Sequence, residues 1–328
     1  MSEVVKIAGK VLAVLEEHED KVVGLLPLKD GSVASCSHDG CVIIWTKEGE
    51  SRLTLDEHQG FVIQILQLKN DNLVSVSLDG SMKIWDLENG KCLKTVEFKE
   101  NLITSVIELE NGCLCGSAGM DVIIWSSDGS KVLSTFSGHK DAVVSVIQIK
   151  DKRIVTGSGD KTLKIWNLDG NCEKTFEGHI NVVRKLKELS DGRIASISDD
   201  DTVRIWNLDG NCEFTLKGHE NLISDIIELS DGRIATSSRD LTIKIWETKE
   251  GKCEVTIRGH TNAIGPLIQL QDERLASGSK DKTIKIWNLE GKCENTLEYH
   301  DGVVNCLVEL KDGKMVSGSW DESIIVWE

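Results

Sequence analysis

Serine or threonine, histidine and aspartate occur together in seven sets along this chain, and serine hydrolases use the same residue types for nucleophilic catalysis. In each set the hydroxyl residue follows the histidine by 17 positions, and the aspartate follows it by 21. A nucleophile acts once, beside an oxyanion hole and a cleft, whereas these sets repeat at equal spacing. The repetition indicates a structural device, and we therefore expect the protein not to be an enzyme.

A tryptophan ends each set and gives the chain its period. Eight tryptophans recur every 40 or 41 residues, a spacing typical of repeat architectures. Seven of them belong to a set, and the eighth is Trp125. In the order histidine, hydroxyl residue, aspartate and tryptophan, the sets are His18, Ser35, Asp39, Trp45; His58, Ser75, Asp79, Trp85; His139, Thr156, Asp160, Trp166; His179, Ser196, Asp200, Trp206; His219, Thr236, Asp240, Trp246; His260, Ser277, Asp281, Trp287; and His300, Ser317, Asp321, Trp327.

The third repeat departs from this pattern. Lys99 occupies the histidine position, and Cys115 and Gly119 stand where the hydroxyl residue and the aspartate are expected. The segment that leads to Trp125 is also one residue short. This repeat cannot form the same polar contacts, so it is either the least stable part of the molecule or a segment reshaped for binding.

Each repeat is expected to form four short strands joined by turns. In the repeat that begins at His260, the runs AIGPLIQL, RLASGS, TIKIWNL and KCENTLE alternate with polar turns and show no helical periodicity. The first and third runs of the repeats are almost continuously apolar, which predicts burial on both faces of each sheet. Radial stacking around an axis buries both faces and leaves only short, protected edges.

The residues also resemble a known family. Segments such as GHKDAVVSV…TGSGDKTLKIWNL and GHTNAIGPL…ASGSKDKTIKIWNL resemble WD-repeat β-propellers, over about residues 10–328. The resemblance implies an all-β fold and a hydrogen-bonded Trp–Ser/Thr–His–Asp tetrad inside each complete blade. With eight tryptophans, we expect a single eight-bladed β-propeller of four-stranded antiparallel blades, whose repeats start near His18, His58, Lys99, His139, His179, His219, His260 and His300.

The two ends of the chain are expected to complement each other. Residues 10–16 align with the fourth strand of a repeat, whereas the chain stops at Trp327-Glu328, the end of a third strand. We expect one domain over 1–328, in which 1–9 form a tail and 10–16 complete the last blade, so that no sheet edge stays open. Pro27 and Pro266 fall in first strands, and the innermost strand tolerates the loss of a donor.

The resemblance further implies that partners bind the top face, the rim that carries the turns before the tetrad aspartates. The position before each aspartate is occupied in turn by His38, Leu78, Ala118, Gly159, Asp199, Arg239, Lys280 and Trp320. Further contact positions follow each histidine by three and five residues, and they include Lys21, Phe61, Ile63, Leu102 and Arg184.

Two groups among these positions suggest ligand chemistry. Trp320 lies outside the tryptophan period and is either a binding hot spot or packed on its neighbouring loop. Arg184, Arg239 and Lys280 lie on consecutive blades and favour an acidic or phosphorylated peptide, unless they are paired with Asp199 or simply solvated.

On the opposite arc, Phe61, Ile63, Leu78 and Leu102 indicate an apolar patch, unless some of them belong to the core. His38 is a further candidate contact on the same rim.

The net charge of the chain makes some classes of binding partner unfavourable. The formal net charge of −16 disfavours nucleic acids and anionic membrane surfaces, although a local basic patch remains compatible with it. The chain shows neither an apolar run long enough to span a membrane nor the pattern of a signal peptide, so we expect an intracellular protein of the cytoplasm or nucleus. We expect no cofactor and no metal.

Ten cysteines could suggest disulfides, but five of them recur at one position of their repeats. Equivalent positions in neighbouring sheets lie about 10 Å apart, too far for a disulfide. Cys92, Cys172, Cys212, Cys253 and Cys293 are therefore expected to be free, small, buried hydrophobic residues in a reducing compartment.

Together these features favour a non-enzymatic scaffold or adaptor, a monomer within larger assemblies, that binds proteins or peptides on the top face. Two alternatives stay open: a reader of an acidic or phosphorylated peptide through Arg184, Arg239, Lys280 and Trp320, and an engineered or recently duplicated repeat protein without a dedicated partner. The last alternative rests on near-identical segments such as NLDGNCE, which occurs at 167–173 and 207–213.

Overall fold

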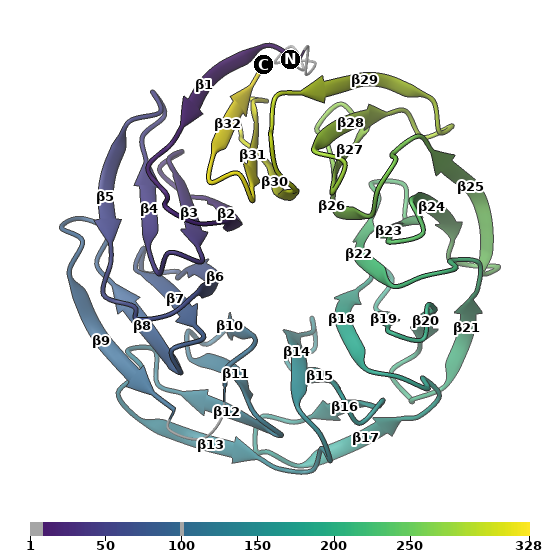
Figure 1. Ribbon diagram of the computed structural model, residues 1–328. Helices are drawn as coiled ribbons and strands as arrows, with labels where there is room; N and C mark the ends of the chain where they lie inside the picture. The colour runs from purple at the N-terminus through teal and green to yellow at the C-terminus, as the bar shows by residue number, and fades with distance from the viewer. Residues whose placement is uncertain (1–8, 99–101) are drawn as a thin grey trace.

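The computed structural model describes residues 9–98 and 102–328, which form a ring of eight four-stranded sheets around a central channel (Figure 1). Every strand pairing is antiparallel. The fold expected from the repeats, an all-β propeller with eight blades, is confirmed. Residues 1–8 of the expected tail and Lys99 lie outside the described residues.

We number the blades from 1 to 8 along the chain. Their first strands, which line the channel, are β2 (Val22–Pro27), β6 (Val62–Gln67), β10 (Val106–Glu108), β14 (Val143–Gln148), β18 (Val183–Glu188), β22 (Ile223–Glu228), β26 (Ile264–Gln269) and β30 (Val304–Glu309). The second strands are β3 (Val33–Ser37), β7 (Leu73–Ser77), β11 (Leu114–Ala118), β15 (Ile154–Ser158), β19 (Ile194–Ser198), β23 (Ile234–Ser238), β27 (Leu275–Ser279) and β31 (Met315–Ser319).

The third strands end at or beside the periodic tryptophans: β4 (Val42–Trp45), β8 (Ser81–Trp85), β12 (Asp121–Trp125), β16 (Leu163–Trp166), β20 (Val203–Trp206), β24 (Thr242–Glu247), β28 (Thr283–Trp287) and β32 (Ile324–Trp327). The fourth strands form the outer circumference (Figure 1): β5 (Ser51–Leu55), β9 (Cys92–Glu97), β13 (Val132–Phe136), β17 (Cys172–Phe176), β21 (Cys212–Leu216), β25 (Lys252–Arg258), β29 (Cys293–Glu298) and, for blade 8, β1 (Val11–Leu15).

The N-terminal strand closes the ring. β1 pairs with β32, with Val11 opposite Trp327 and Leu15 opposite Ile324. Two backbone hydrogen bonds extend this pairing, because the Gly9 N–H donates to the Glu328 carbonyl and the Glu328 N–H donates to the Lys10 carbonyl. The expected closure is therefore present, and the first and last described segments of the chain share one sheet.

The core lies between neighbouring blades. In the cluster shared by blades 4 and 5, Val155 and Ile165 pack with Val183, Leu186 and other apolar residues. The tryptophan of each blade enters such a cluster; Trp206, for example, lies 5.5 Å from the Phe176 ring of the preceding blade. A single blade therefore cannot bury its own faces, and the ring is the smallest unit that does.

Burial along the strands differs from the expectation. The most buried strands are the second ones, in which all five residues are buried in every blade, whereas the first strands are only partly buried. The prediction that the first runs are covered on both faces was wrong, because one of their sides borders the open channel. Small residues in the second strands allow the next blade to approach; a Cβ at Gly157 would lie 2.8 Å from Val183 Cγ1.

The prediction that the repeated cysteines are buried was also wrong. Cys172, Cys253 and Cys293 are exposed, and Cys92 and Cys212 are half-buried. Each is the first or second residue of a fourth strand, on the outer circumference of the ring. No cysteine of the described residues forms a disulfide. The two prolines lie in first strands, as expected: Pro27 ends β2, and Pro266 lies at an irregularity in the pairing of β26.

Candidate functional site

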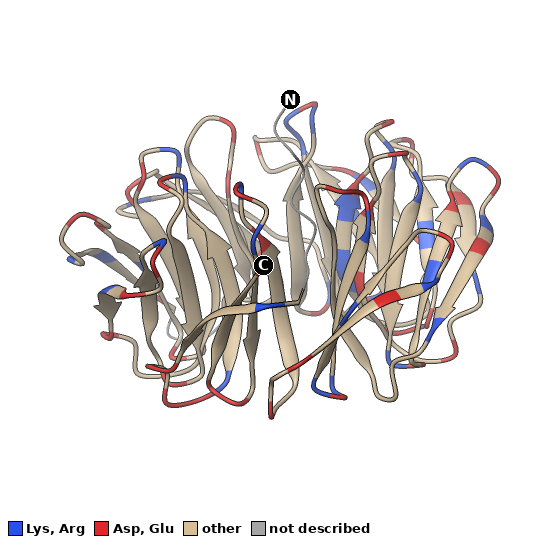
Figure 2. Cartoon of the chain, turned by 90° about the horizontal axis from the view of Figure 1, so that it is seen from above, with Lys and Arg blue, Asp and Glu red and all other residues tan. Residues whose placement is uncertain are grey.

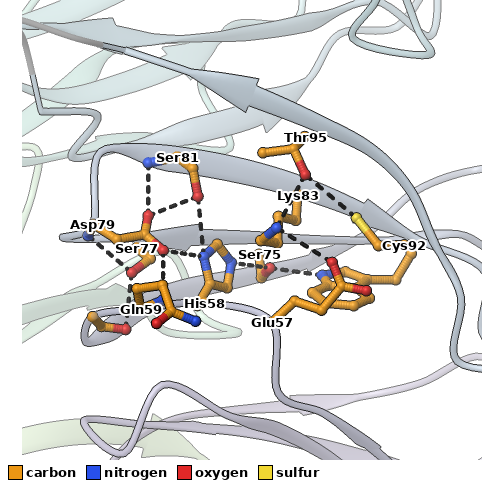
Figure 3. Close-up of polar contacts among 12 residues, drawn as sticks. Glu57, His58, Gln59, Ser75, Ser77, Asp79, Ser81, Lys83, Cys92 and Thr95 are labelled. Carbon is orange, nitrogen blue, oxygen red and sulfur yellow. Dashed lines mark hydrogen bonds and ion pairs between the residues drawn. The ribbon is translucent and has the colours of Figure 1, made fainter.

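The seven Ser/Thr–His–Asp sets form buried chains of hydrogen bonds that start at the tryptophans. In blade 2 (Figure 3), the Trp85 Nε1–H donates to Ser75 Oγ at 2.7 Å, and His58 Nε2 lies 2.7 Å from the same oxygen. His58 Nδ1 lies 2.8 Å from Asp79 Oδ2. Because ionised Asp79 only accepts, the Nδ1–H donates to it and Nε2 accepts the serine proton, so every member is satisfied.

The other six sets repeat this geometry. Across all seven, the tryptophan-to-hydroxyl distances are 2.7–2.9 Å. The histidine-to-hydroxyl distances are 2.7–2.8 Å. The shortest histidine-to-aspartate distances are 2.6–3.0 Å.

The aspartates do more than orient the histidines. Asp79 also accepts the Gln59 N–H and the Ser81 hydroxyl (Figure 3), which ties the turn before the third strand to the entry of the blade. Burial alone would raise the pKa of Asp79, but these hydrogen bonds and His58 outweigh it and lower the pKa to about 2. The second hydroxyl was not anticipated, although Ser81 has counterparts two residues after most tetrad aspartates: Thr162, Thr202, Thr242, Thr283 and Ser323.

Three of the tetrad histidines, His58, His139 and His219, are biased toward the neutral form. Burial lowers the pKa of His58, against the opposing effect of the Asp79 carboxylate, and it lowers the pKa of His139 and His219 in the same way. The hydroxyl oxygens are fully buried and already accept a tryptophan N–H. Because these oxygens are buried and already hydrogen-bonded, the arrangement favours a structural role over a nucleophilic one.

Blade 3 lacks this chain of hydrogen bonds. The Trp125 Nε1–H has no acceptor among the described residues, and buried Cys115 stands at the hydroxyl position. Phe98 packs edge-on against Trp125 at 5.5 Å. Ser117 instead binds Thr104, whose hydroxyl also donates to the Val143 carbonyl of blade 4, so local contacts partly replace the tetrad.

On the top face, the basic residues do not act as one group. Arg184 forms a two-pronged ion pair with Asp199, at 2.9 Å from Nε and 2.5 Å from Nη2. The structure thus favours the pairing alternative for Arg184. Arg239 and Lys280 are exposed, and no acidic side chain of the described residues pairs with either. Charged residues lie mainly in the loops at the two faces of the ring (Figure 2).

Trp320 lies beside the unpaired cations. Its side chain is 38% exposed, and the Lys21 and Lys280 ammonium groups lie 5.3 and 5.9 Å from its ring centre. Trp320, Lys280 and Arg239 line a cavity of about 370 Å³ at the channel mouth. Asp225 also lines it, but Lys185 pairs with that carboxylate. The contact with Lys21 joins blade 1 to this group and was not predicted, because it depends on ring closure.

The apolar positions divide into surface and core. Phe61, Leu78 and Leu102 are 43%, 43% and 50% exposed. His38 stacks on Phe61 with ring centres 4.2 Å apart. Ile63 is half-buried and packs against the cluster between blades 2 and 3, which favours the core alternative for this residue.

An eight-bladed ring with Trp–Ser/Thr–His–Asp chains in its blades defines a β-propeller of the WD type. The family model of the WD domain, G-beta repeat (WD40), matches residues 9–46, 49–86, 130–167, 170–207, 210–247, 251–288 and 291–328. The chain belongs to the WD40 repeat family. The stretch between residues 86 and 130, which holds β9 of blade 2 and the first three strands of blade 3, is not matched.

Solved structures share the whole ring. The computationally designed Ika8 protein is 27% identical, with a TM-score of 0.86, over 97% of this chain and 99% of that one. The WD40 β-propeller domain of Doa1 is 21% identical, with a TM-score of 0.69, over 97% and 96%. The likeness to Doa1 shows the fold alone. No curated protein matches the chain.

WD40 propellers are typically scaffolds for protein interaction and are generally not catalysts. The described part of the chain contains no helix with the length and apolar character that crossing a bilayer requires.

Proposed function

We propose that this protein is a non-enzymatic scaffold that binds an acidic or phosphorylated segment of a protein partner on its top face, at Lys21, Arg239, Lys280 and Trp320, here called the basic arc. The observation that carries this proposal is the exposed Trp320 ring between two lysines, beside a cavity that Arg239 also lines. These three cations carry positive charge without a carboxylate partner among the described residues, in a protein of net charge −16.

The geometry suits an anion next to an apolar group. Arginine and lysine bind phosphate or carboxylate through charge-assisted hydrogen bonds, and an exposed tryptophan offers a flat apolar contact. A cation beside the tryptophan face contributes about 0.5–1 kcal/mol at an exposed site, so Lys21 and Lys280 also hold the ring in place. Arg184 is omitted from the arc because Asp199 already occupies its guanidinium.

The test is binding of a peptide library with phosphorylated and Asp/Glu-rich arms, read by fluorescence anisotropy. Arg239→Glu and Lys280→Glu should each weaken the best binder about tenfold or more, and Trp320→Ala should weaken it similarly. The control is Lys140→Glu, which makes the same charge change on another exposed top-face lysine and should leave affinity unchanged. Equal losses in control and arc variants, or none, would reject the basic arc.

A second candidate surface is the apolar arc of His38, Phe61, Leu78 and Leu102, which the exposed fractions of its side chains support. A partner that docks there should lose affinity in Phe61→Ala and Leu78→Ala and keep it in Arg239→Glu. The likeness to a designed protein supports the alternative that the chain has no dedicated partner. Under that alternative, affinity purification from cells recovers nothing above background.

A further inference from the structure

Seven of the eight blade junctions carry the same hydrogen-bonded clasp on the bottom face, opposite the top face. The backbone N–H two residues after each first strand donates to the side-chain oxygen of the residue that ends the first strand of the next blade, at 2.7–3.0 Å. The donor and acceptor pairs are Lys29 and Gln67, Lys69 and Glu108, Glu110 and Gln148, Lys150 and Glu188, Ser190 and Glu228, Ser230 and Gln269, and Gln271 and Glu309.

A lysine at the donor position strengthens the clasp. The Lys29 ammonium donates to the Leu68 and Lys69 carbonyls of blade 2, both at 2.9 Å. Lys69 binds the corresponding carbonyls of blade 3, and Lys150 does the same in blade 5. The clasp thus uses two donors of one residue, its backbone N–H and its side chain.

The junction between blades 8 and 1 has no clasp. Pro27 ends the first strand of blade 1, where the other blades have glutamine or glutamate, and its side chain has no acceptor atom. The donor residue at this junction is Lys311. Among the residues that the structure describes, neither its backbone N–H nor its ammonium group has an acceptor. The donors of a clasp are therefore present without their partner.

An apolar cavity opens at the same junction. Its volume is about 520 Å³, within the range of small-molecule sites, and its walls include Leu28, Trp45, Val316 and Val326. Lys311 and Pro27 line this cavity and also an adjacent hollow formed with blade 7.

The charges at the cavity favour an anion. Asp30 is paired with Arg52, and Asp312 is paired with Lys314. Glu309 also lines the cavity; one of its carboxylate oxygens accepts the Gln271 N–H in the clasp with blade 7, but no cation among the described residues pairs with it. Lys47 also lines the cavity, and its ammonium has no ion-pair partner among the described residues. The two unpaired ammonium groups of Lys47 and Lys311 therefore outnumber the one unpaired carboxylate, Glu309, around a cavity that also has an apolar wall.

We propose that this cavity binds a medium-chain carboxylic acid. The hydrocarbon body fills the apolar space between blades 8 and 1. The carboxylate accepts hydrogen bonds from the Lys311 N–H and ammonium, as a glutamine or glutamate side chain accepts the N–H at the seven other junctions. The cavity is on the bottom face, so this site is independent of the basic arc.

Decanoate is the probe, titrated into the full chain by isothermal calorimetry below its micelle concentration. We expect saturable binding of one decanoate per chain and at least tenfold weaker binding of decanol, which keeps the body and lacks the charge. Pro27→Gln supplies the internal acceptor and should weaken decanoate about tenfold. Lys311→Met should weaken it by a similar factor. The double variant Asp312→Asn/Lys314→Met removes a cavity lysine together with the carboxylate that pairs with it and should change the affinity less than twofold.

Several results would overturn the proposal. These are no saturable binding of decanoate, equal binding of decanol, and affinities in Pro27→Gln or Lys311→Met equal to that of the unaltered chain. Thermal melts establish that each variant folds. If Pro27→Gln does not fold, the comparison of Lys311→Met with Asp312→Asn/Lys314→Met decides the matter alone. Binding of an acidic peptide to the top face should be the same in all these variants.

Discussion

Replacing Ser196 by alanine tests the structural role of the tetrads. The Ser196 hydroxyl is fully buried, accepts the Trp206 N–H at 2.8 Å and lies 2.7 Å from His179 Nε2. Its loss leaves a buried donor and a buried acceptor without partners, each at a cost of about 1–3 kcal/mol. Because a small change such as Ser→Ala adds no bulk, we expect the free energy of unfolding to fall by about 2–4 kcal/mol.

Two matched variants sharpen this test. Ser196→Thr keeps the hydroxyl, and threonine occupies the same position in blades 4 and 6, so most of the stability should be retained. Ser190→Ala makes the same chemical change at an exposed serine of the same blade and should stay within about 0.5 kcal/mol of the unaltered protein.

Urea unfolding followed by both tryptophan fluorescence and circular dichroism measures the free energies of these variants. The protein should still fold in Ser196→Ala, because blade 3 already tolerates a tryptophan N–H without an acceptor among the described residues. A cost below about 0.5 kcal/mol, or equal losses in Ser196→Ala and Ser196→Thr, would refute the reasoning.

Three further results are expected. Burial holds the pKa of His58 below its usual value, and hydrogen bonds hold that of Asp79 at about 2 despite burial, so the folded state binds fewer protons than the unfolded one. The free energy of unfolding, measured by urea titrations at each pH, should therefore be highest above about pH 6.5 and fall on acidification. It falls first because histidines protonate in the unfolded state, and again between about pH 4 and 2, where aspartate protonates in the unfolded state before it does in the folded state. A free energy that does not change with pH would contradict this. Deleting residues 1–16 removes β1 from blade 8 and should lower the melting temperature strongly, and a melt within a few degrees of the full chain would reject the importance of closure. Cys115→Ser offers the Trp125 N–H an acceptor and should stabilise the protein by about 1 kcal/mol in urea unfolding, whereas destabilisation would show that the pocket does not accommodate a hydroxyl there.

Periodicity made the ring and its tetrads predictable. A tryptophan that recurs every 40 or 41 residues counts the blades directly, and the missing tetrad of blade 3 can be read from Cys115 and Gly119. Closure followed from the complementary ends of the chain. These features depend on residue identity at fixed spacing, which a sequence displays.

Features that depend on position within the ring were harder to predict. The exposure of Cys172 follows from its place on the outer circumference, and the pairing of Arg184 with Asp199 follows from side-chain reach. The contact between Lys21 and Trp320 joins blades 1 and 8, which meet only when the ring closes. The clasp was not predicted because both glutamine and glutamate occur at its acceptor position, although their spacing, and the break at Pro27, are visible in the sequence.

Ring closure also has a consequence for biosynthesis. Lys10 and Glu328, whose side chains pair at 3.4 Å, are 318 residues apart. At about 5–20 residues per second, translation makes the first strand about 15–60 seconds before its partner. During that interval β1 is an unpaired strand with the apolar sequence VLAVL, able to pair with the wrong edge or a neighbouring nascent chain. The segment that seals the finished ring is thus the one most in need of protection while the chain is being made.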